Sequence, residues 1–258
     1  MLQVFTNAEE LRKSAAEIFL QSAADAVKEN GRFTVALTGG SSPAGLYKLL
    51  ATSPYFEQVP WTKTYIFWGD ERWVPLTDER SNAKMAFETL LNHVPVPKEH
   101  IFPMWSDEKP EEFAFKYEEQ LLNHFAGEAP RFDLILSGMG DDGHTASLFP
   151  GTEVLHERER FVSAYYLAPQ SMYRITLTAP CINAAKKVVF LVFGEKKADA
   201  LQQVLEGVSN PEKYPSQLIK PAKGEIIWLV DEMAASKLTN TKVVSESIAV
   251  QVSDTTKG

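Results

Sequence analysis

The chain has 258 residues, of which 44% are hydrophobic and 23% are charged. This is an ordinary globular composition, and the length suits one large α/β domain or two small domains. The 26 basic and 34 acidic residues give a formal net charge of −8. We therefore expect neither nucleic-acid binding nor attachment to an anionic membrane, because both require a basic surface. An anionic ligand would have to be met by a few locally placed Lys or Arg side chains.

The single cysteine, Cys181, excludes an internal disulfide and a cysteine-rich metal site. The first 30 residues lack a basic segment followed by an apolar run, so we expect no signal peptide. The strongly apolar runs, such as residues 188–193, are too short to span a bilayer. These observations predict a cytoplasmic protein without a membrane-spanning segment.

The first elements alternate between helix and strand. Asn7, with Glu10 three residues later, predicts the start of a helix. Apolar and small residues then recur at helical spacing as far as Ala26, and Gly31 predicts the end of this helix. Residues 33–37 form a short apolar run that predicts a buried strand. Pro43 predicts the start of a second helix, which runs to about residue 52.

The same alternation continues along the chain. Further strands are predicted at residues 64–68, 132–137, 174–178, 188–193 and 226–230, and further helices at 83–91, 110–125 and 198–206. Apolar strands separated by helices indicate βαβ units and a mainly parallel sheet. No linker rich in Pro or Gly divides the chain, so we expect one α/β domain over residues 1–238. Residues 239–258 are predicted to form a polar tail or an edge strand.

Ligands of such sheets bind at the carboxyl ends of the strands, which makes the segments directly after the strands candidate sites. The segment after Leu37 reads Thr38-Gly39-Gly40-Ser41-Ser42-Pro43. Its glycines permit a tight turn, and free N–H groups at the following helix start can hold a phosphate. The same residues fit a plain strand-to-helix turn with a serine cap. No Lys follows at the spacing of a P-loop.

Charged residues follow the strand at 64–68 and also lie at the start of two later elements. The segment after Trp68 reads Gly69-Asp70-Glu71-Arg72-Trp73-Val74-Pro75, which fits either a functional site or a solvated loop with an internal ion pair. Arg174 opens the strand at 174–178, and Lys197 precedes the helix at 198–206. Lys197 could reach a phosphate bound at the strand ends.

The segment at residues 137–151 contains Gly-x-Gly-x-x-Gly at positions 138, 140 and 143. A dinucleotide site is disfavoured there, because Asp141 and Asp142 would repel a pyrophosphate and no long helix follows. His144 lies outside any apolar pattern, and an imidazole, with a pKa of about 6.5, accepts a proton near neutral pH. The chain has no Gly-x-Ser-x-Gly elbow and no His pair at zinc spacing, which favours a general base acting on water.

Three segments, residues 38–43, 70–75 and 140–150, together resemble the 6-phosphogluconolactonase family in order and spacing. The resemblance extends over roughly residues 5–236. The family belongs to a wider group that includes glucosamine-6-phosphate deaminase. The resemblance implies a three-layer α/β sandwich with a mostly parallel, Rossmann-like sheet. It also implies hydrolysis of 6-phospho-D-glucono-1,5-lactone to 6-phosphogluconate in the oxidative pentose phosphate pathway, with no cofactor and no metal.

The resemblance further implies roles for individual residues. His144 would be the general base that takes a proton from water, and Arg72 would stabilise the negative charge that develops at the lactone end. Asp142 would position His144 or bind a sugar hydroxyl. The substrate-binding set would comprise Gly39, Asp70 for hydroxyls, and the phosphate ligands Gly40, Ser41, Ser42, Arg174 and Lys197.

Two alternatives remain open at this point. A deaminase-like sugar-phosphate isomerase of the wider group would use Asp70 as its base. It would carry a glutamate where this chain has Phe149, and a tyrosine in place of Arg72. A non-catalytic sugar-phosphate sensor would need a DNA-binding module, of which the first 31 residues show no sign. The expected partner is a small sugar-phosphate lactone, and the chain is expected to be a monomer or a homodimer.

Overall fold

The computed structural model describes residues 1–239 and has a six-stranded parallel sheet at its centre. The strand order is β1-β9-β8-β5-β2-β3. The bounds are β1 Leu2–Phe5, β2 Phe33–Leu37, β3 Thr64–Trp68, β5 Leu134–Gly138, β8 Lys187–Val192 and β9 Glu225–Asp231. The predicted parallel sheet is confirmed. The segment predicted as a tail or edge strand lies, apart from Thr239, outside the described residues.

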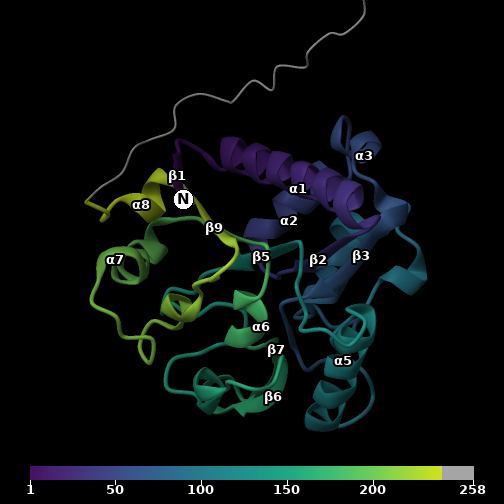
Figure 1. The fold of residues 1–258 in the computed structure, drawn as a ribbon. Coiled ribbons are helices and arrows are strands. Elements are labelled where there is room, and N and C mark those ends of the chain that lie inside the picture. The colour runs from purple at the N-terminus through teal and green to yellow at the C-terminus, as the bar shows by residue number, and fades with distance from the viewer. Residues whose placement is uncertain (240–258) are drawn as a thin grey trace, which may run out of the picture.

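Helices cover both faces of this main sheet, as the predicted three-layer arrangement requires. Figure 1 shows α1 and α2 on one side of the sheet, with α6 and a smaller sheet on the other. The bounds are α1 Ala8–Asn30, α2 Ser41–Leu50, α3 Tyr55–Gln58, α4 Asn82–Ala86, α5 Pro110–His124, α6 Ala179–Asn183, α7 Ala198–Glu206 and α8 Glu232–Ala235. Within residues 1–239, no helix combines the length and the apolar character that crossing a membrane would need.

The long helix α1 begins and ends where the sequence predicts. The side chain of Asn7 accepts hydrogen bonds from the backbone N–H groups of Glu9 and Glu10, at 3.0 and 2.9 Å. Gly31 ends the helix in the left-handed conformation, with φ of +76°, which a residue without a Cβ adopts readily. The helix at 83–91 is less regular than predicted, because α4 ends at Ala86 and the chain continues as a π-helical turn over Phe87–Leu91.

A second sheet has three antiparallel strands, β4 Asp70–Arg72, β7 Met172–Leu177 and β6 Val162–Leu167, in the order β4-β7-β6. The sequence did not predict this second sheet. The segment after Trp68 is not a loop, because Asp70–Arg72 pairs with β7. The strand predicted at 174–178 belongs to this small sheet and not to the parallel one.

The two sheets are joined where β3 passes into β4. The backbone N–H of Gly69 donates to the carbonyl of Leu37 in the main sheet, at 2.8 Å. The carbonyl of the same glycine accepts from the N–H of Leu177 in the small sheet, also at 2.8 Å. This junction places the small sheet beside the carboxyl ends of β2, β3 and β5, the edge at which ligands are expected.

Candidate active site

A cavity of about 440 Å³ lies at this edge of the main sheet. It is lined by most of the predicted site residues, namely Gly39, Gly40, Ser42, Asp70, Arg72, His144, Arg174 and Lys197. Ser41 begins α2, between two of the lining residues. Asp142 is not part of the lining, but its carboxylate contacts the imidazole of His144. Segments that are far apart in the sequence therefore meet around one space.

His144 is held by the carboxylate of Asp142. Its Nδ1 lies 2.6 Å from Oδ1 of Asp142, and its backbone N–H donates to the same oxygen at 3.1 Å. Burial alone would raise the pKa of Asp142, but the hydrogen bond and charge of His144 outweigh it, so that this pKa lies below its usual value. When Nδ1 donates to the carboxylate, Nε2 carries the free lone pair. Nε2 has no hydrogen-bond partner within residues 1–239 and is therefore available to accept a proton.

The loop around this pair is shaped to fit it. The ring of Phe149 stacks on the imidazole of His144, with ring centroids 4.0 Å apart and an interplanar angle of 24°. A Cβ at position 140 would lie 2.1 Å from Nδ1 of His144 and 2.5 Å from Oδ1 of Asp142. Gly140 therefore leaves the space that the His144–Asp142 pair occupies. The second glycine of the Gly-x-Gly-x-x-Gly pattern thus has a local steric explanation.

Two arginines project from one face of the small sheet into the cavity. Arg72 in β4 lies directly opposite Arg174 in β7, so both side chains are on the same face. Burial is the largest effect and lowers the pKa of Arg174; the charge of Asp70 acts in the opposite direction, and the charge of Arg72 lowers this pKa further. Oδ2 of Asp70 lies 3.8 Å from Nη1 of Arg174. Two guanidinium groups beside this carboxylate favour an anion in the cavity.

The guanidinium groups are partly fixed and partly unpaired. Nη1 of Arg72 donates to the carbonyl of Arg80 at 2.6 Å, and Nη2 of Arg174 donates to the side chain of Gln170. The Nε atoms of both arginines are buried and have no hydrogen-bond partner within residues 1–239. Since an unpaired buried donor is unfavourable, these arginines are suited to receive a polar ligand.

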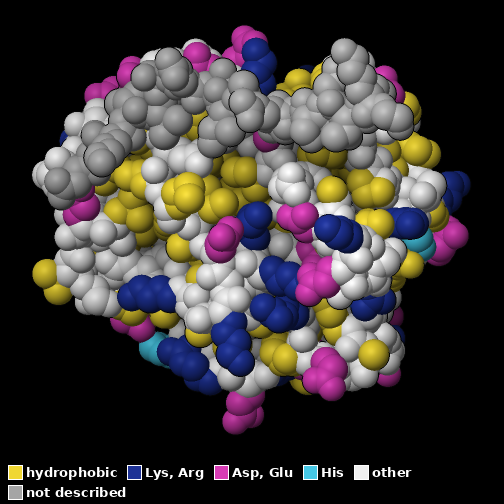
Figure 2. Space-filling view, turned by 45° about the horizontal axis from the view of Figure 1, so that its top comes forward, with side chains coloured by type: hydrophobic (Ala, Val, Ile, Leu, Met, Phe, Trp, Pro, Cys, Tyr) yellow, Lys and Arg dark blue, Asp and Glu magenta, His cyan; other side chains and the backbone are white. Residues whose placement is uncertain are grey.

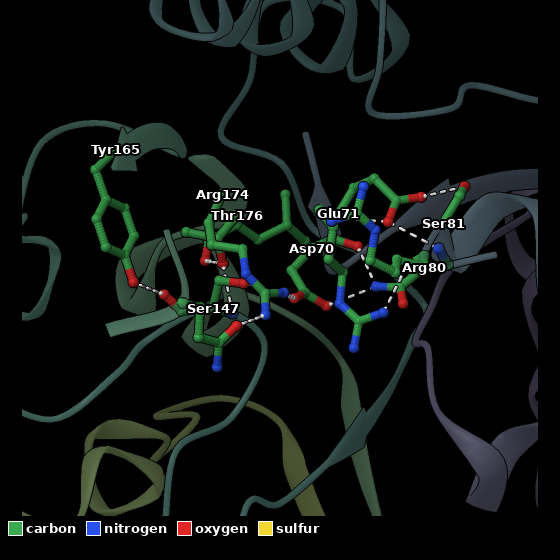
Figure 3. A network of polar contacts seen from close by, with 12 residues as sticks. Asp70, Glu71, Arg80, Ser81, Ser147, Tyr165, Arg174 and Thr176 are labelled. Atoms are coloured by element: carbon green, nitrogen blue, oxygen red, sulfur yellow. Dashed lines mark hydrogen bonds and ion pairs between the residues drawn. The ribbon is translucent and has the colours of Figure 1, made fainter. Parts of the chain in front are cut away.

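Asp70 lies near Arg174 and is held by neutral side chains. Oγ of Ser147 donates to its Oδ2 at 2.6 Å, and Nδ2 of Asn82 lies 3.3 Å from its Oδ1. Figure 3 shows Ser147 and Arg174 on one side of Asp70, with Glu71 and Ser81 on the other. Gly39 supports this arrangement, because a Cβ there would lie 1.7 Å from Oδ1 of Asn82. The carboxylate is therefore oriented before any ligand binds.

Glu71 is a structural residue, and its side chain lies on the face of β4 opposite to that of Asp70 and Arg72. Its carboxylate is fully buried and accepts hydrogen bonds from the backbone N–H groups of Arg72, Asn82 and Ala83 at 2.7–2.8 Å. Burial raises the pKa of Glu71 to about 7, although these N–H groups act to lower it. The carboxylate thus ties β4 to the first turn of α4. Of the two alternatives for this segment, the solvated loop with an internal ion pair does not fit the structure.

The glycine-rich turn after β2 leads into α2 without a serine cap. Gly40 is the N-cap residue, with φ of +102°, and it offers no side chain to the N–H groups of the first turn. Those groups point toward the end of the helix and carry its partial positive charge, which suits a phosphate. The N-cap position therefore holds no serine, and the anion cradle stays a prediction.

Lys197 approaches the cavity from the 3₁₀ turn Glu195–Lys197 before α7. Its Nζ lies 2.6 Å from Oδ1 of Asp141, in the loop after β5. Nothing in the sequence predicts this pairing, because the two residues belong to different loops. Nothing singles out Asn82, Ser147 and Gln170 either, which are ordinary polar residues until the fold brings them to Asp70 and Arg174. Within residues 1–239, no three His, Cys, Asp or Glu side chains are grouped so that they could hold a metal ion.

The family model described as glucosamine-6-phosphate isomerases/6-phosphogluconolactonase matches residues 6–228. The chain belongs to this family. A 6-phosphogluconolactonase of Synechocystis sp. is 43% identical over 217 residues, which cover 83% of this chain and 88% of that protein. A probable 6-phosphogluconolactonase of Arabidopsis thaliana is 36% identical, over 93% of this chain and 94% of its own length. The resemblance recognised in the sequence is confirmed, and the protein is an enzyme of this family.

Solved structures of the family share the fold. A crystal structure of 6-phosphogluconolactonase from Leishmania guyanensis has a TM-score of 0.80 and 28% identity, and the match covers 93% of this chain and 99% of that one. A monomeric glucosamine-6-phosphate deaminase has a TM-score of 0.76 at 22% identity, over 92% of this chain and 98% of that one. The second similarity shows the fold alone, so the residues of the site must distinguish the two activities.

Proposed function

We propose that the protein hydrolyses 6-phospho-D-glucono-1,5-lactone to 6-phosphogluconate, in the oxidative pentose phosphate pathway and in the cytoplasm. The names of its relatives support the substrate. The observation that carries the proposal is that a carboxylate-held imidazole and three cations, Arg72, Arg174 and Lys197, line one cavity. The only cysteine, Cys181, is free and buried, as in proteins of reducing compartments.

In this proposal His144 acts first as a base and then as an acid. Its Nε2 takes a proton from a water molecule, whose oxygen attacks the lactone carbonyl carbon. The carbonyl oxygen becomes an oxyanion, which the guanidinium of Arg72 stabilises. The intermediate then collapses, the bond between the carbonyl carbon and the ring oxygen breaks, and the imidazolium returns its proton to the departing oxygen. Asp142 keeps the imidazole in the required tautomer and orientation.

The remaining residues would anchor the sugar phosphate. The N–H groups at the start of α2, together with Arg174 and Lys197, would hold the phosphate, and Asp70 would accept hydrogen bonds from sugar hydroxyls. Anchoring the distant phosphate fixes the lactone carbonyl relative to His144, and such positioning contributes to the rate of a reaction with water.

A deaminase-like activity is the competing possibility, and the cavity disfavours it. The glutamate expected for that chemistry is replaced by Phe149, whose ring stacks on His144. The tyrosine expected in that branch is replaced by Arg72. Release of ammonia from glucosamine 6-phosphate would identify the deaminase, and we expect none.

The decisive test is His144→Asn with freshly prepared 6-phosphogluconolactone, after spontaneous opening of the lactone has been subtracted. Loss of the base is expected to lower kcat/KM by about 10²–10⁴-fold. Asp142→Asn should lower kcat by a smaller factor and alter its pH profile, because the carboxylate acts through the imidazole. A His144→Asn enzyme that is folded by circular dichroism and within a few-fold of wild type would overturn the proposal.

The unphosphorylated lactone is the matched substrate control. The wild-type enzyme should prefer the phosphorylated lactone strongly, because three cations face the cavity. Arg174→Met should reduce this preference and affect the unphosphorylated lactone much less. Equal turnover of both lactones by the wild-type enzyme would contradict the assigned phosphate ligands.

A further inference from the structure

One of the three cations around the cavity already has a close anionic partner. Nζ of Lys197 lies 2.6 Å from Oδ1 of Asp141, whereas the carboxylate nearest to Arg174, that of Asp70, is 3.8 Å away. Arg72 makes no ion pair within residues 1–239. The Lys197–Asp141 pair joins the 3₁₀ turn before α7 to the loop after β5 across the edge of the cavity. Lys197 lines the cavity and Asp141 does not.

This arrangement sets a carboxylate in competition with an incoming phosphate. The ammonium group of Lys197 carries a single positive charge, and a phosphate dianion that binds it must share or displace Asp141. A carboxylate left beside a phosphate would repel it. On the face drawn in Figure 2, Lys and Arg side chains are likewise interspersed with Asp and Glu, and do not form one continuous basic patch.

We propose that Asp141 weakens the binding of phosphorylated ligands by acting through Lys197, and so favours release of the phosphorylated product. This inference rests on the proposed function and assigns a role to a residue which that mechanism does not use. Asp141 is a positioning residue, since it touches the lysine and not the reacting atoms. Its effect falls on substrate and product alike, because both carry the same phosphate.

The expected effect is small, because the pair is partly exposed. The side chains of Lys197 and Asp141 are 26% and 57% exposed. Exposed ion pairs contribute modestly and are screened by salt, so removing the competitor should tighten phosphate binding about two- to fivefold. The change should diminish at high ionic strength.

Asp141→Asn is the direct test, because it removes the charge and keeps the shape of the side chain. We expect KM for the phosphorylated lactone and the inhibition constants of 6-phosphogluconate and inorganic phosphate to fall together, by about two- to fivefold. The rate of opening of the unphosphorylated lactone should not change. Calorimetric titration of the variant with inorganic phosphate gives a readout that does not depend on turnover.

The chain offers a matched control in Glu195, an exposed residue two positions before Lys197 that makes no ion pair within residues 1–239. Glu195→Gln removes the same charge from the same turn and should leave phosphate binding within twofold of wild type. A double-mutant cycle tests the route of the effect. In a Lys197→Met background, Asp141→Asn should no longer improve phosphate binding.

Three outcomes would overturn the inference. The first is an unchanged KM for the phosphorylated lactone in Asp141→Asn. The second is a raised KM in that variant, which would mean that the ion pair orders Lys197 for the phosphate. The third is an equal effect of Glu195→Gln on phosphate binding. Failure of the proposed function would look different. In that case the wild-type enzyme would not open the phosphorylated lactone, while the titrations with inorganic phosphate would still report on Asp141.

Discussion

At the scale of single residues, the site depends on two glycines that have no side chain. Gly140 and Gly39 each lack a Cβ that would overlap a neighbouring polar group, His144 in one case and Asn82 in the other. These glycines are needed for close approach, and not for an unusual backbone, since neither has a positive φ. The sequence shows such glycines only as members of motifs, and the steric reason becomes visible once their neighbours are placed.

Gly140→Ala should separate the geometry of the His144–Asp142 pair from its chemistry. The added methyl group would force the imidazole off the carboxylate while both side chains remain present. A displacement of about 1 Å at a reacting group can lower the rate by about a hundredfold, so we expect a loss in kcat of about ten- to a hundredfold. Steady-state kinetics of the purified variant measures this loss.

Gly69→Ala is the control for this prediction, because its added Cβ would meet no atom closer than the Leu37 carbonyl oxygen, at 3.6 Å. It should keep most of the activity. If Gly140→Ala has the kcat of Gly69→Ala, the pair does not need the space that the glycine leaves.

At the scale of elements, β4 shows why part of the site could not be predicted. Three consecutive charged residues carry no apolar alternation, so nothing in Asp70–Arg72 indicates a strand. The segment becomes one because β7 pairs with it, and the period of two then sends Asp70 and Arg72 toward the cavity and Glu71 into the interior. The strongly patterned elements were predicted closely, with β2, β3 and α7 matching residue for residue.

The end of α5 carries a prediction about acid stability. His124, the last residue of this helix, lies against the rings of Tyr65 and Phe67, and its Nε2 is 2.8 Å from Oγ1 of Thr34. Burial, followed by the charges of Arg32 and His100, lowers the pKa of His124 to about 4. Between about pH 6.5 and 4 the unfolded chain therefore binds a proton that the native state does not, and stability is lost as the pH falls.

His124→Gln should reduce this acid sensitivity, because glutamine can keep a hydrogen bond to Thr34 and does not titrate. The free energy of unfolding in urea, measured at pH 7.5 and pH 5, should fall less in the variant than in the wild type. His93→Gln, at an exposed position, is the control and should behave like the wild type. Parallel losses in all three proteins would mean that other groups cause the acid sensitivity.

At the scale of the whole molecule, the site is shared between two sheets. His144 follows β5 of the main sheet, whereas Asp70, Arg72 and Arg174 belong to the small sheet. The alternation of strands and helices predicted the main sheet, and the rule that ligands bind at carboxyl ends pointed to the edge at which the cavity lies. It did not predict the small sheet, because antiparallel pairing between β4 and β7 depends on residues a hundred positions apart.

Ser147 links the two halves of the site. It is fully buried, its Oγ donates to Asp70 in the small sheet at 2.6 Å, and its N–H donates to Oγ1 of Thr176 at 3.1 Å. It lies three residues after His144, so it ties the loop that carries the imidazole to the strand that carries the carboxylate. The position of His144 relative to Asp70 should therefore depend on this hydroxyl.

Ser147→Ala should consequently affect both stability and substrate binding. Loss of a hydrogen bond to a buried carboxylate is expected to lower the free energy of unfolding by about 1–3 kcal/mol. It should also raise KM for the phosphorylated lactone several-fold, because Asp70 loses one of its hydrogen-bond donors.

Ser137→Ala is the control, because it removes a buried hydroxyl that lies 2.9 Å from Oγ1 of Thr145 and does not contact Asp70. It should lower stability to a similar extent and leave KM nearly unchanged. If urea denaturation and steady-state kinetics show the same losses for both variants, the hydroxyl of Ser147 supports packing alone and does not align the two sheets.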